Sequence, residues 1–114
     1  MESLRPSEVI KFRAECFKAC DGAGVYSLYS IRSDFRKIFT PEDFNEHFKL
    51  LTKDKEHAGL KIVAESIKSN LAEVKYIEHI NENGKLQTFY SKTFLTKEEG
   101  KWCILKEIRE KREN

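Results

Sequence analysis

The 114-residue sequence contains little cysteine and no long apolar run, and both shortages restrict what kind of protein it can be. No stretch approaches membrane-spanning length, and the start, MESLRPSEVI, lacks the apolar core of a signal peptide. We therefore expect a cytoplasmic protein with no membrane partner, unless a leader was removed. Three cysteines cannot build a disulfide framework, and Cys16 and Cys20, one helical turn apart, are poorly spaced for a bond within a helix.

An excess of charge of one sign is also lacking. The chain has 21 Lys and Arg against 19 Asp and Glu, so its net charge is only +2. The densest basic stretch, residues 32–37, is short and contains Asp34. Nucleic-acid binding needs a concentrated basic face, so we expect no nucleic-acid partner. The three histidines are scattered rather than spaced as ligands, so the sequence predicts no metal and no cofactor.

The chain is long enough for one domain with its own core, and we expect residues 1–114 to form that domain, with a core over about residues 7–108. Its first part is helical. Pro6 opens a helix in which Val9, Phe12 and Cys16 recur at intervals of three and four. This spacing predicts a buried stripe, with Arg13 on the solvent side.

A further helix begins at Thr40, where a capping residue precedes Pro41 and two acidic residues. Phe44 and Phe48 form its apolar face, and His47 lies on that face. Between the two helices, VYSLYS predicts a short helix that is followed by a loop. Residues 53–59 are charged and end in glycine, so they predict another loop.

From Leu60 onward, apolar and polar residues alternate, which is the period of a strand. This pattern predicts four strands, at residues 60–69, 71–79, 85–96 and 101–108, joined largely by tight turns such as Asn83-Gly84. Helices followed by antiparallel strands predict an α+β fold, with the helices packed on one face of a curved sheet.

Three stretches resemble the nuclear transport factor 2-like superfamily: CDGAGVYSLYS after an amphipathic helix, FRKIFTPEDFNEHF, and strands that close on GKWCIL. The resemblance covers about residues 7–108 and is narrowest to small stand-alone domains of lumazine-binding-like or unknown function. It implies a cystatin-like cone, in which a strongly bent sheet wraps around helices and often opens into an apolar pocket. It also implies homodimers through the outer sheet face. The superfamily includes ketosteroid isomerase and many non-catalytic members, so fold alone decides little.

The register of the last hairpin decides the direction of Trp102, the only tryptophan. A loop with an even number of residues puts Leu95, Trp102 and Ile104 on one face, whereas a three-residue loop pairs Phe94 with Ile104. The resemblance favours Leu95 and Trp102 inside. Cys103 and Leu105 would then lie outside and form an apolar surface that needs a cover, which favours a dimer.

Thirteen aromatic residues can either line a pocket or fill a solid core, and the sequence leaves both open. The candidates for a pocket wall are Phe17, Cys20, Tyr26, Tyr29, Phe35, Phe44, His47, Phe48, Tyr76 and Trp102. We expect the hydroxyl groups of Tyr26 and Tyr29 at the rim of such a pocket or bonded to a backbone carbonyl.

An enzyme with this fold would need a base that points into the cone, and His47 and Asp34 are the candidates. Both have simpler explanations, His47 as a boundary residue and Asp34 as a turn residue that caps backbone amides. No catalytic arrangement of the superfamily's enzymes matches this sequence. We therefore expect a non-catalytic homodimeric domain that binds a small apolar ligand or another protein. An isomerase, dehydratase or hydrolase that uses His47 or Asp34 is the alternative.

Overall fold

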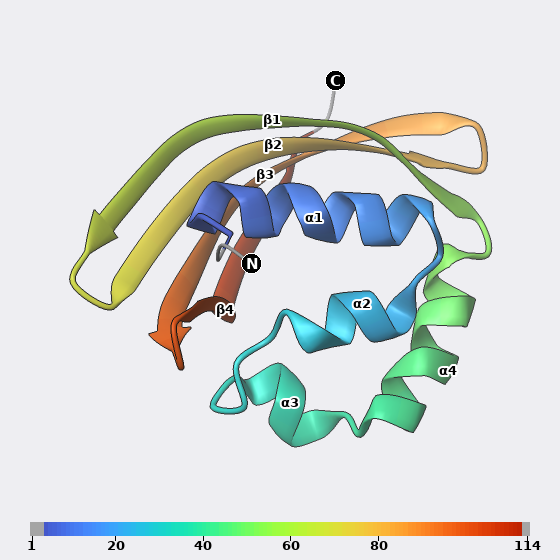
Figure 1. Cartoon of the computed structure of the whole chain (residues 1–114). Coiled ribbons are helices and arrows are strands. Elements are labelled where there is room, and N and C mark those ends of the chain that lie inside the picture. Colours follow the sequence, from blue (N-terminus) through green and yellow to red (C-terminus); the bar gives the residue numbers. More distant parts are fainter. Residues whose placement is uncertain (1–3, 113–114) are drawn as a thin grey trace.

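The computed structural model describes residues 4–112 and shows four helices followed by four strands (Figure 1). The helices are α1 (Pro6–Lys18), α2 (Gly22–Ser27), α3 (Asp34–Ile38) and α4 (Pro41–Thr52). The strands are β1 (Lys55–Lys68), β2 (Leu71–Glu82), β3 (Lys85–Glu98) and β4 (Lys101–Arg112). They form one antiparallel sheet in the order β1-β2-β3-β4. The predicted α+β fold is confirmed.

The sheet bends strongly and arches over α1, while α2, α3 and α4 lie on the same concave side (Figure 1). The core sits between α1 and the sheet. Val9 and Ile10 of α1 and Val74, Leu95 and Ile104 of the sheet are all at most 2% exposed. A strongly curved sheet with helices in its concave face is the arrangement that the sequence predicted.

The start of α4 forms as its capping signal predicted, because the Thr40 hydroxyl oxygen accepts a hydrogen bond from the Asp43 amide at 3.1 Å. Two other predictions about the helical part were wrong. The loop predicted through Ser33 and Asp34 ends at Ser33, because its hydroxyl oxygen caps the Arg36 amide and residues 34–38 form α3. The loop predicted at residues 53–59 is short, since β1 already begins at Lys55.

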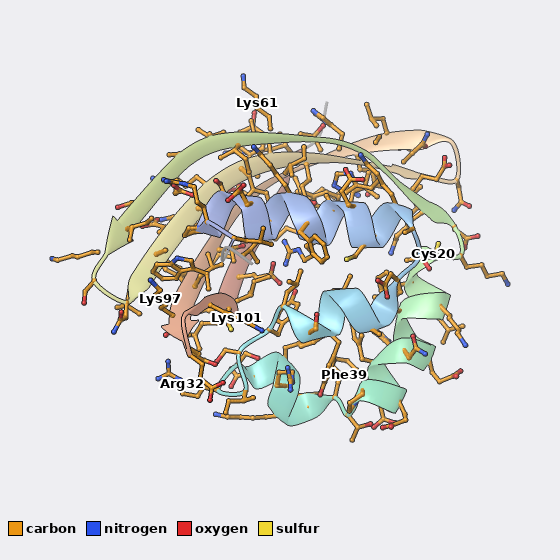
Figure 2. The ribbon with its side chains drawn as sticks, viewed as in Figure 1. Cys20, Arg32, Phe39, Lys61, Lys97 and Lys101 are labelled. Carbon is orange, nitrogen blue, oxygen red and sulfur yellow. The ribbon has the colours of Figure 1, made fainter. Side chains whose placement is uncertain are left out.

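The buried face of α1 differs from the predicted stripe. Phe12 is 46% exposed, whereas Arg13 is only 8% exposed. Arg13 follows Val9 and Ile10 by four and three residues, so it lies on the face that packs against the sheet. The helix also ends at Lys18, which leaves Cys20 exposed in the turn after α1 (Figure 2).

Three β-bulges decide which residues face the helices. Ala58, Val63 and Leu105 have no partner in the strand pairing, so the alternation of inward and outward side chains shifts by one residue at each. On β4, Ile104 pairs with Leu95 and Glu107 pairs with Thr93, although an unbroken alternation from Ile104 would turn Glu107 outward. The bulge at Ala58 likewise shifts the alternation of β1 by one residue next to His57.

The register of the last hairpin follows the predicted even-residue loop. Glu98 pairs with Lys101 across a two-residue turn, and Leu95 pairs with Ile104. Trp102 shares the inward face with Ile104, and its half-buried ring packs against the core with the Lys97 ammonium 5.7 Å from the ring centroid. β4 continues to Arg112, so the part of the polar tail that is described pairs with β3 instead of fraying; residues 113–114 lie outside the description.

Candidate ligand-binding site

A cavity of about 440 Å³ lies between the helices and the concave face of the sheet. Its apolar wall comes almost entirely from the helical part of the chain and consists of Ala14, Phe17, Val25, Phe35, Phe39, Phe44, Phe48 and Leu51, with His47 among them and Ile80 from the sheet. Its polar wall consists of Arg13 and Tyr29 together with His57, Tyr76, Glu78, Ser91, Glu107 and Arg109 from the sheet. The cavity is therefore apolar on one side and polar on the other.

The aromatic rings of the apolar wall pack against one another. Phe35 stacks on Tyr29 with ring centroids 4.0 Å apart and meets Phe44 edge-on at 4.8 Å. The Phe48 ring packs against the rings of Phe44 and Phe17, with centroid distances of 5.6 and 5.7 Å. Rings that hold one another in these geometries have little freedom to change their rotamers, so this wall is rigid.

A closed set of hydrogen bonds joins Arg13 to the sheet. Its guanidinium group donates to the Tyr29 hydroxyl at 2.9 Å and to the Tyr76 hydroxyl at 2.6 Å, and it forms an ion pair with Glu107. The Tyr29 hydroxyl donates to the Glu107 carboxylate at 2.7 Å. The Tyr76 hydroxyl shares a hydrogen bond with the Thr93 hydroxyl at 2.7 Å. Each of these polar groups therefore has its partner within the protein.

The charges of this set are fixed by their proximity. Burial opposes charge on both partners, but the attraction between them outweighs it, so the pKa of Arg13 is held above its usual value and the pKa of Glu107 below. Burial raises the pKa of Tyr29 and of Tyr76. At neutral pH the ion pair is charged and both hydroxyls keep their protons, which agrees with the direction of the hydrogen bond from Tyr29 to Glu107.

A second polar set contains a histidine and a carboxylate. His57 Nε2 lies 2.9 Å from Glu78 Oε2, and Arg109 donates to Glu78 Oε1 at 2.9 Å. The side chains of His57 and Glu78 are 2% and 6% exposed. Burial alone would raise the pKa of Glu78, but the hydrogen bond with His57 and the charges of Arg13 and Arg109 outweigh it and lower this pKa. Glu78 is thus an ionised acceptor with both oxygens engaged.

The structure brings seven of the ten predicted wall residues together around the cavity: Phe17, Tyr29, Phe35, Phe44, His47, Phe48 and Tyr76. Tyr26 lies behind this wall, where its hydroxyl donates to the Phe39 carbonyl at 2.9 Å, the kind of bond predicted for it. Trp102 lies near the β3–β4 turn, where Figure 2 places Lys97 and Lys101. Cys20 lies just after the C-terminal end of α1. These last two residues lie outside the cavity lining.

The two predicted candidates for a general base differ in position. The His47 ring borders the cavity and stacks on Phe39 with centroids 5.2 Å apart, while much of the side chain remains exposed. Figure 2 shows Phe39 between α3 and α4. Asp34 lies in the first turn of α3 and is not part of the cavity lining. A role of either as a base remains a prediction.

Sequence reasoning missed five charged or titratable residues of the polar wall, namely Arg13, His57, Glu78, Glu107 and Arg109. Two of them carried a signal. Glu78 has the same parity as the buried residues Val74 and Tyr76 of its strand, and Arg13 has helical spacing from Val9 and Ile10. His57, Glu107 and Arg109 carried none, because β-bulges set their directions.

Other kinds of site find little support in the described part of the chain. Within residues 4–112, no three His, Cys, Asp or Glu side chains gather in a way that could hold a metal ion. None of the helices α1 to α4 is both long and apolar enough to cross a membrane. The three cysteines are free, with Cys16 buried, Cys20 exposed and Cys103 between the two.

No protein-family model and no curated protein matches the sequence, but solved structures match the fold. A SEC-C motif containing protein from Rhodopseudomonas palustris superposes with a TM-score of 0.81 at 14% identity, over 95% of this chain and 80% of that one. A protein of unknown function with a cystatin-like fold from Nostoc punctiforme gives 0.71 at 12% identity, over 98% and 96%. A nuclear transport factor 2-like protein of unknown function from Shewanella oneidensis gives 0.72 at 12%, over 90% and 93%. The chain thus has the cystatin-like, nuclear transport factor 2-like fold that its sequence indicated.

Proposed function

We propose that the protein is a non-catalytic binding domain that holds a small, mostly apolar molecule in the cavity of the cone. The observation that carries this proposal is the cavity itself, about 440 Å³ in volume with an aromatic wall opposite a polar one. Small-molecule sites have volumes of roughly 300–1,000 Å³ and combine apolar walls with a few polar groups that orient the ligand.

The charges of the cavity support an uncharged ligand. Arg13 pairs with Glu107 and Arg109 pairs with Glu78, so each cation faces a carboxylate. No unpaired charge is left that would attract an ion of opposite sign. A flat molecule that lies against Phe35 and the neighbouring rings would gain most of its affinity from apolar contact.

The alternative function, an isomerase, dehydratase or hydrolase with His47 or Asp34 as base, has less support. Asp34 is outside the cavity lining, and His47 stands at its edge against Phe39. A general base must come within hydrogen-bonding reach of the proton that it removes, and the position of Asp34 outside the lining does not support that role.

The test is native mass spectrometry of the purified protein beside its denatured mass, followed by titration with naphthalene. Leu51→Trp fills the edge of the cavity, whereas Leu50→Trp places the same bulk on a side chain that is 74% exposed and outside the lining. We expect bound small-molecule mass or naphthalene binding that Leu51→Trp weakens and Leu50→Trp leaves unchanged. A bare protein that also fails to bind naphthalene would overturn the proposal.

We also propose that two copies pair through the convex face of the sheet, where Lys61 points away from the helices (Figure 2). A shallow hollow on this face is lined by Val63, Tyr90 and Ile108, which are 56%, 46% and 51% exposed. Lys92 and Glu110 border it. A two-fold symmetric dimer packs this patch against the same patch of the second copy. Lys92 of each copy can then lie opposite Glu110 of the other.

The association state tests this second proposal. Ile108→Glu places a charge within the patch, and Leu50→Glu places the same charge on an exposed position of α4. Analytical ultracentrifugation should show a dimer for the wild type and Leu50→Glu and a monomer for Ile108→Glu. A wild type that stays monomeric at high concentration would contradict it.

We propose a cytoplasmic location because the cysteines form no disulfide bond. All three cysteines are free, which suits a reducing compartment. Growth of cells that produce the protein with a C-terminal fluorescent tag, followed by fractionation, checks this location.

A further inference from the structure

We infer that His57, held in place by Glu78, is the polar anchor of the cavity and accepts a hydrogen bond from an N–H or O–H group of a flat, uncharged ligand. This inference rests on the proposed binding function and adds the chemical class of the ligand and the atom that recognises it.

The contacts of Glu78 fix the direction of the hydrogen bond from His57. One carboxylate oxygen accepts from the Arg109 guanidinium at 2.9 Å, and the other lies 2.9 Å from His57 Nε2. An ionised carboxylate can only accept, so Nε2 carries the proton and donates it. In the neutral ring, Nδ1 then has a free lone pair and acts as an acceptor.

His57 Nδ1 is buried and has no partner among residues 4–112. Its side chain is 2% exposed, and the ring that packs beside it, Phe17 at 6.1 Å between centroids, has no N–H or O–H to offer. Buried acceptors in folded proteins almost always have a partner, so an unpartnered acceptor on a residue that lines the cavity is a place for a ligand's donor.

Two hollows meet at His57 and Phe17, and their linings differ. One is the cavity of the cone, and the other is a groove that runs past the end of α4 to the β2–β3 turn. Lysines and acidic residues line much of the groove, such as Lys53 and Asp54, whereas stacked rings line the cone. Phe17 and His57 line both hollows, but the other aromatic rings lie in the cone, so a flat ligand gains most of its apolar contact there and its donor would reach Nδ1 from that side.

The same wall disfavours other ligand classes. Glu78 and Glu107 are each paired with an arginine, so these two ion pairs leave no net charge on the wall to hold an anion or a cation. A ligand whose polar atom can only accept would place its lone pair against that of Nδ1, and the two would repel each other. The arrangement therefore selects a neutral donor, such as the N–H of an indole-like ring or the O–H of a phenol-like ring.

Three bicyclic probes of similar size test the inference with the full chain: indole, which donates through N–H; quinoline, which accepts; and naphthalene, which does neither. Affinities come from NMR titration of isotope-labelled protein. We expect indole to bind about tenfold more tightly than either other probe, the worth of one hydrogen bond. The Nδ1 resonance of His57 should move with indole alone.

The NMR signals also show where the probe binds. The methyl signals of Val25 and Leu51, which line only the cone, should shift when indole is added, and the amide signals of the groove residues Asn83 and Gly84 should not.

Two histidine variants locate the effect. His57→Phe keeps a ring but removes the acceptor, so the preference for indole should vanish while naphthalene still binds. His47→Phe changes the other histidine of the lining, whose ring stacks on Phe39, and should keep the preference. If His57→Phe does not fold, the comparison of the three probes on the wild type still decides.

The outcomes separate this inference from the proposed function. Equal affinity for the three probes, or a preference for quinoline, would overturn the role of His57 and leave the binding function standing. Binding of indole that moves only the groove amides would overturn the placement in the cone. Failure of all three probes to bind would remove support from the binding function itself.

Discussion

Arg13 is the charged side chain on which the polar wall depends, since it contacts Tyr29, Tyr76 and Glu107 at once. Replacing Arg13 with Met keeps the apolar length but leaves the Glu107 carboxylate without its cation. We expect Arg13→Met to lower the free energy of unfolding by about 3 kcal/mol, because Arg13 is buried and its loss leaves Glu107 without its cation and two tyrosine hydroxyls without their donor. Urea unfolding followed by circular dichroism measures it.

The control for this variant is Lys11→Met, on the exposed side of the same helix. Surface substitutions of this kind change stability by roughly 0.5 kcal/mol or less. If the two variants lose the same stability, the network around Arg13 contributes nothing beyond helix packing, and its place in the fold has to be argued differently.

Trp102 gives a second measurement on a single residue. Its ring is half-buried at the end of the core and outside the cavity lining. We expect Trp102→Ala to cost about 1–2 kcal/mol, because much of its surface already meets solvent. Leu95, which is 0% exposed on the paired strand, is the comparison, and Leu95→Ala should cost about 2–5 kcal/mol. Thermal and urea unfolding of the two variants measure these costs. A larger loss of stability for Trp102→Ala than for Leu95→Ala would contradict the prediction.

The bulge at Leu105 acts at the level of a whole strand. It lets Ile104 and Glu107 both face the helices although three positions separate them. Deleting Leu105 removes the extra residue and leaves the neighbouring pairs of β3 and β4 intact, so we expect the variant to fold with Glu107 still beside Arg13. Deleting Lys92 from β3, which has no bulge to absorb the loss, should reverse every side chain beyond it and abolish folding.

NMR spectra show whether each deletion variant folds, and Arg13→Met reports on Glu107. In the chain that lacks Leu105, this substitution should still cost about 3 kcal/mol, because the ion pair persists. A cost near zero in that background would mean that Glu107 has turned outward, and the role assigned to the bulge would then be wrong.

The elements that could be predicted from sequence are those with a local signal. Turns and caps have one, so the starts of β2, β3 and β4 and the start of α4 were placed correctly. The bulges have none, because Val63 and Leu105 look like ordinary strand residues and Ala58 falls in the predicted loop at residues 53–59. Spacing therefore found most of the aromatic wall, while the directions of His57 and Glu107 depended on tertiary structure.

For the molecule as a whole, the two carboxylates of the polar wall set the stability at acid pH. The pKa values of Glu78 and Glu107 lie below their ordinary value of 4.5 in the folded chain, despite burial, because His57 and the arginines favour the charged form. The unfolded chain thus binds more protons once the pH falls below about 4.5, so stability is full above that pH and is lost as the pH falls further. Urea unfolding between pH 7 and 3 should show this decline, and Glu78→Gln should make it shallower, whereas Glu46→Gln on exposed α4 should not.

At alkaline pH the same buried wall acts through its tyrosines. Burial raises the pKa of Tyr29 and Tyr76 above the ordinary value of 10.0, so both hydroxyls stay protonated in the folded chain while the unfolded chain ionises. Their contribution is therefore full below pH 10 and is lost as the pH rises above it. Tyrosinate absorbance should develop in two steps, the second together with unfolding, and Tyr29→Phe should shrink that second step. A single step that is complete before the protein unfolds would show that the hydroxyls facing Arg13 are open to water, and the closed polar wall would not exist in solution.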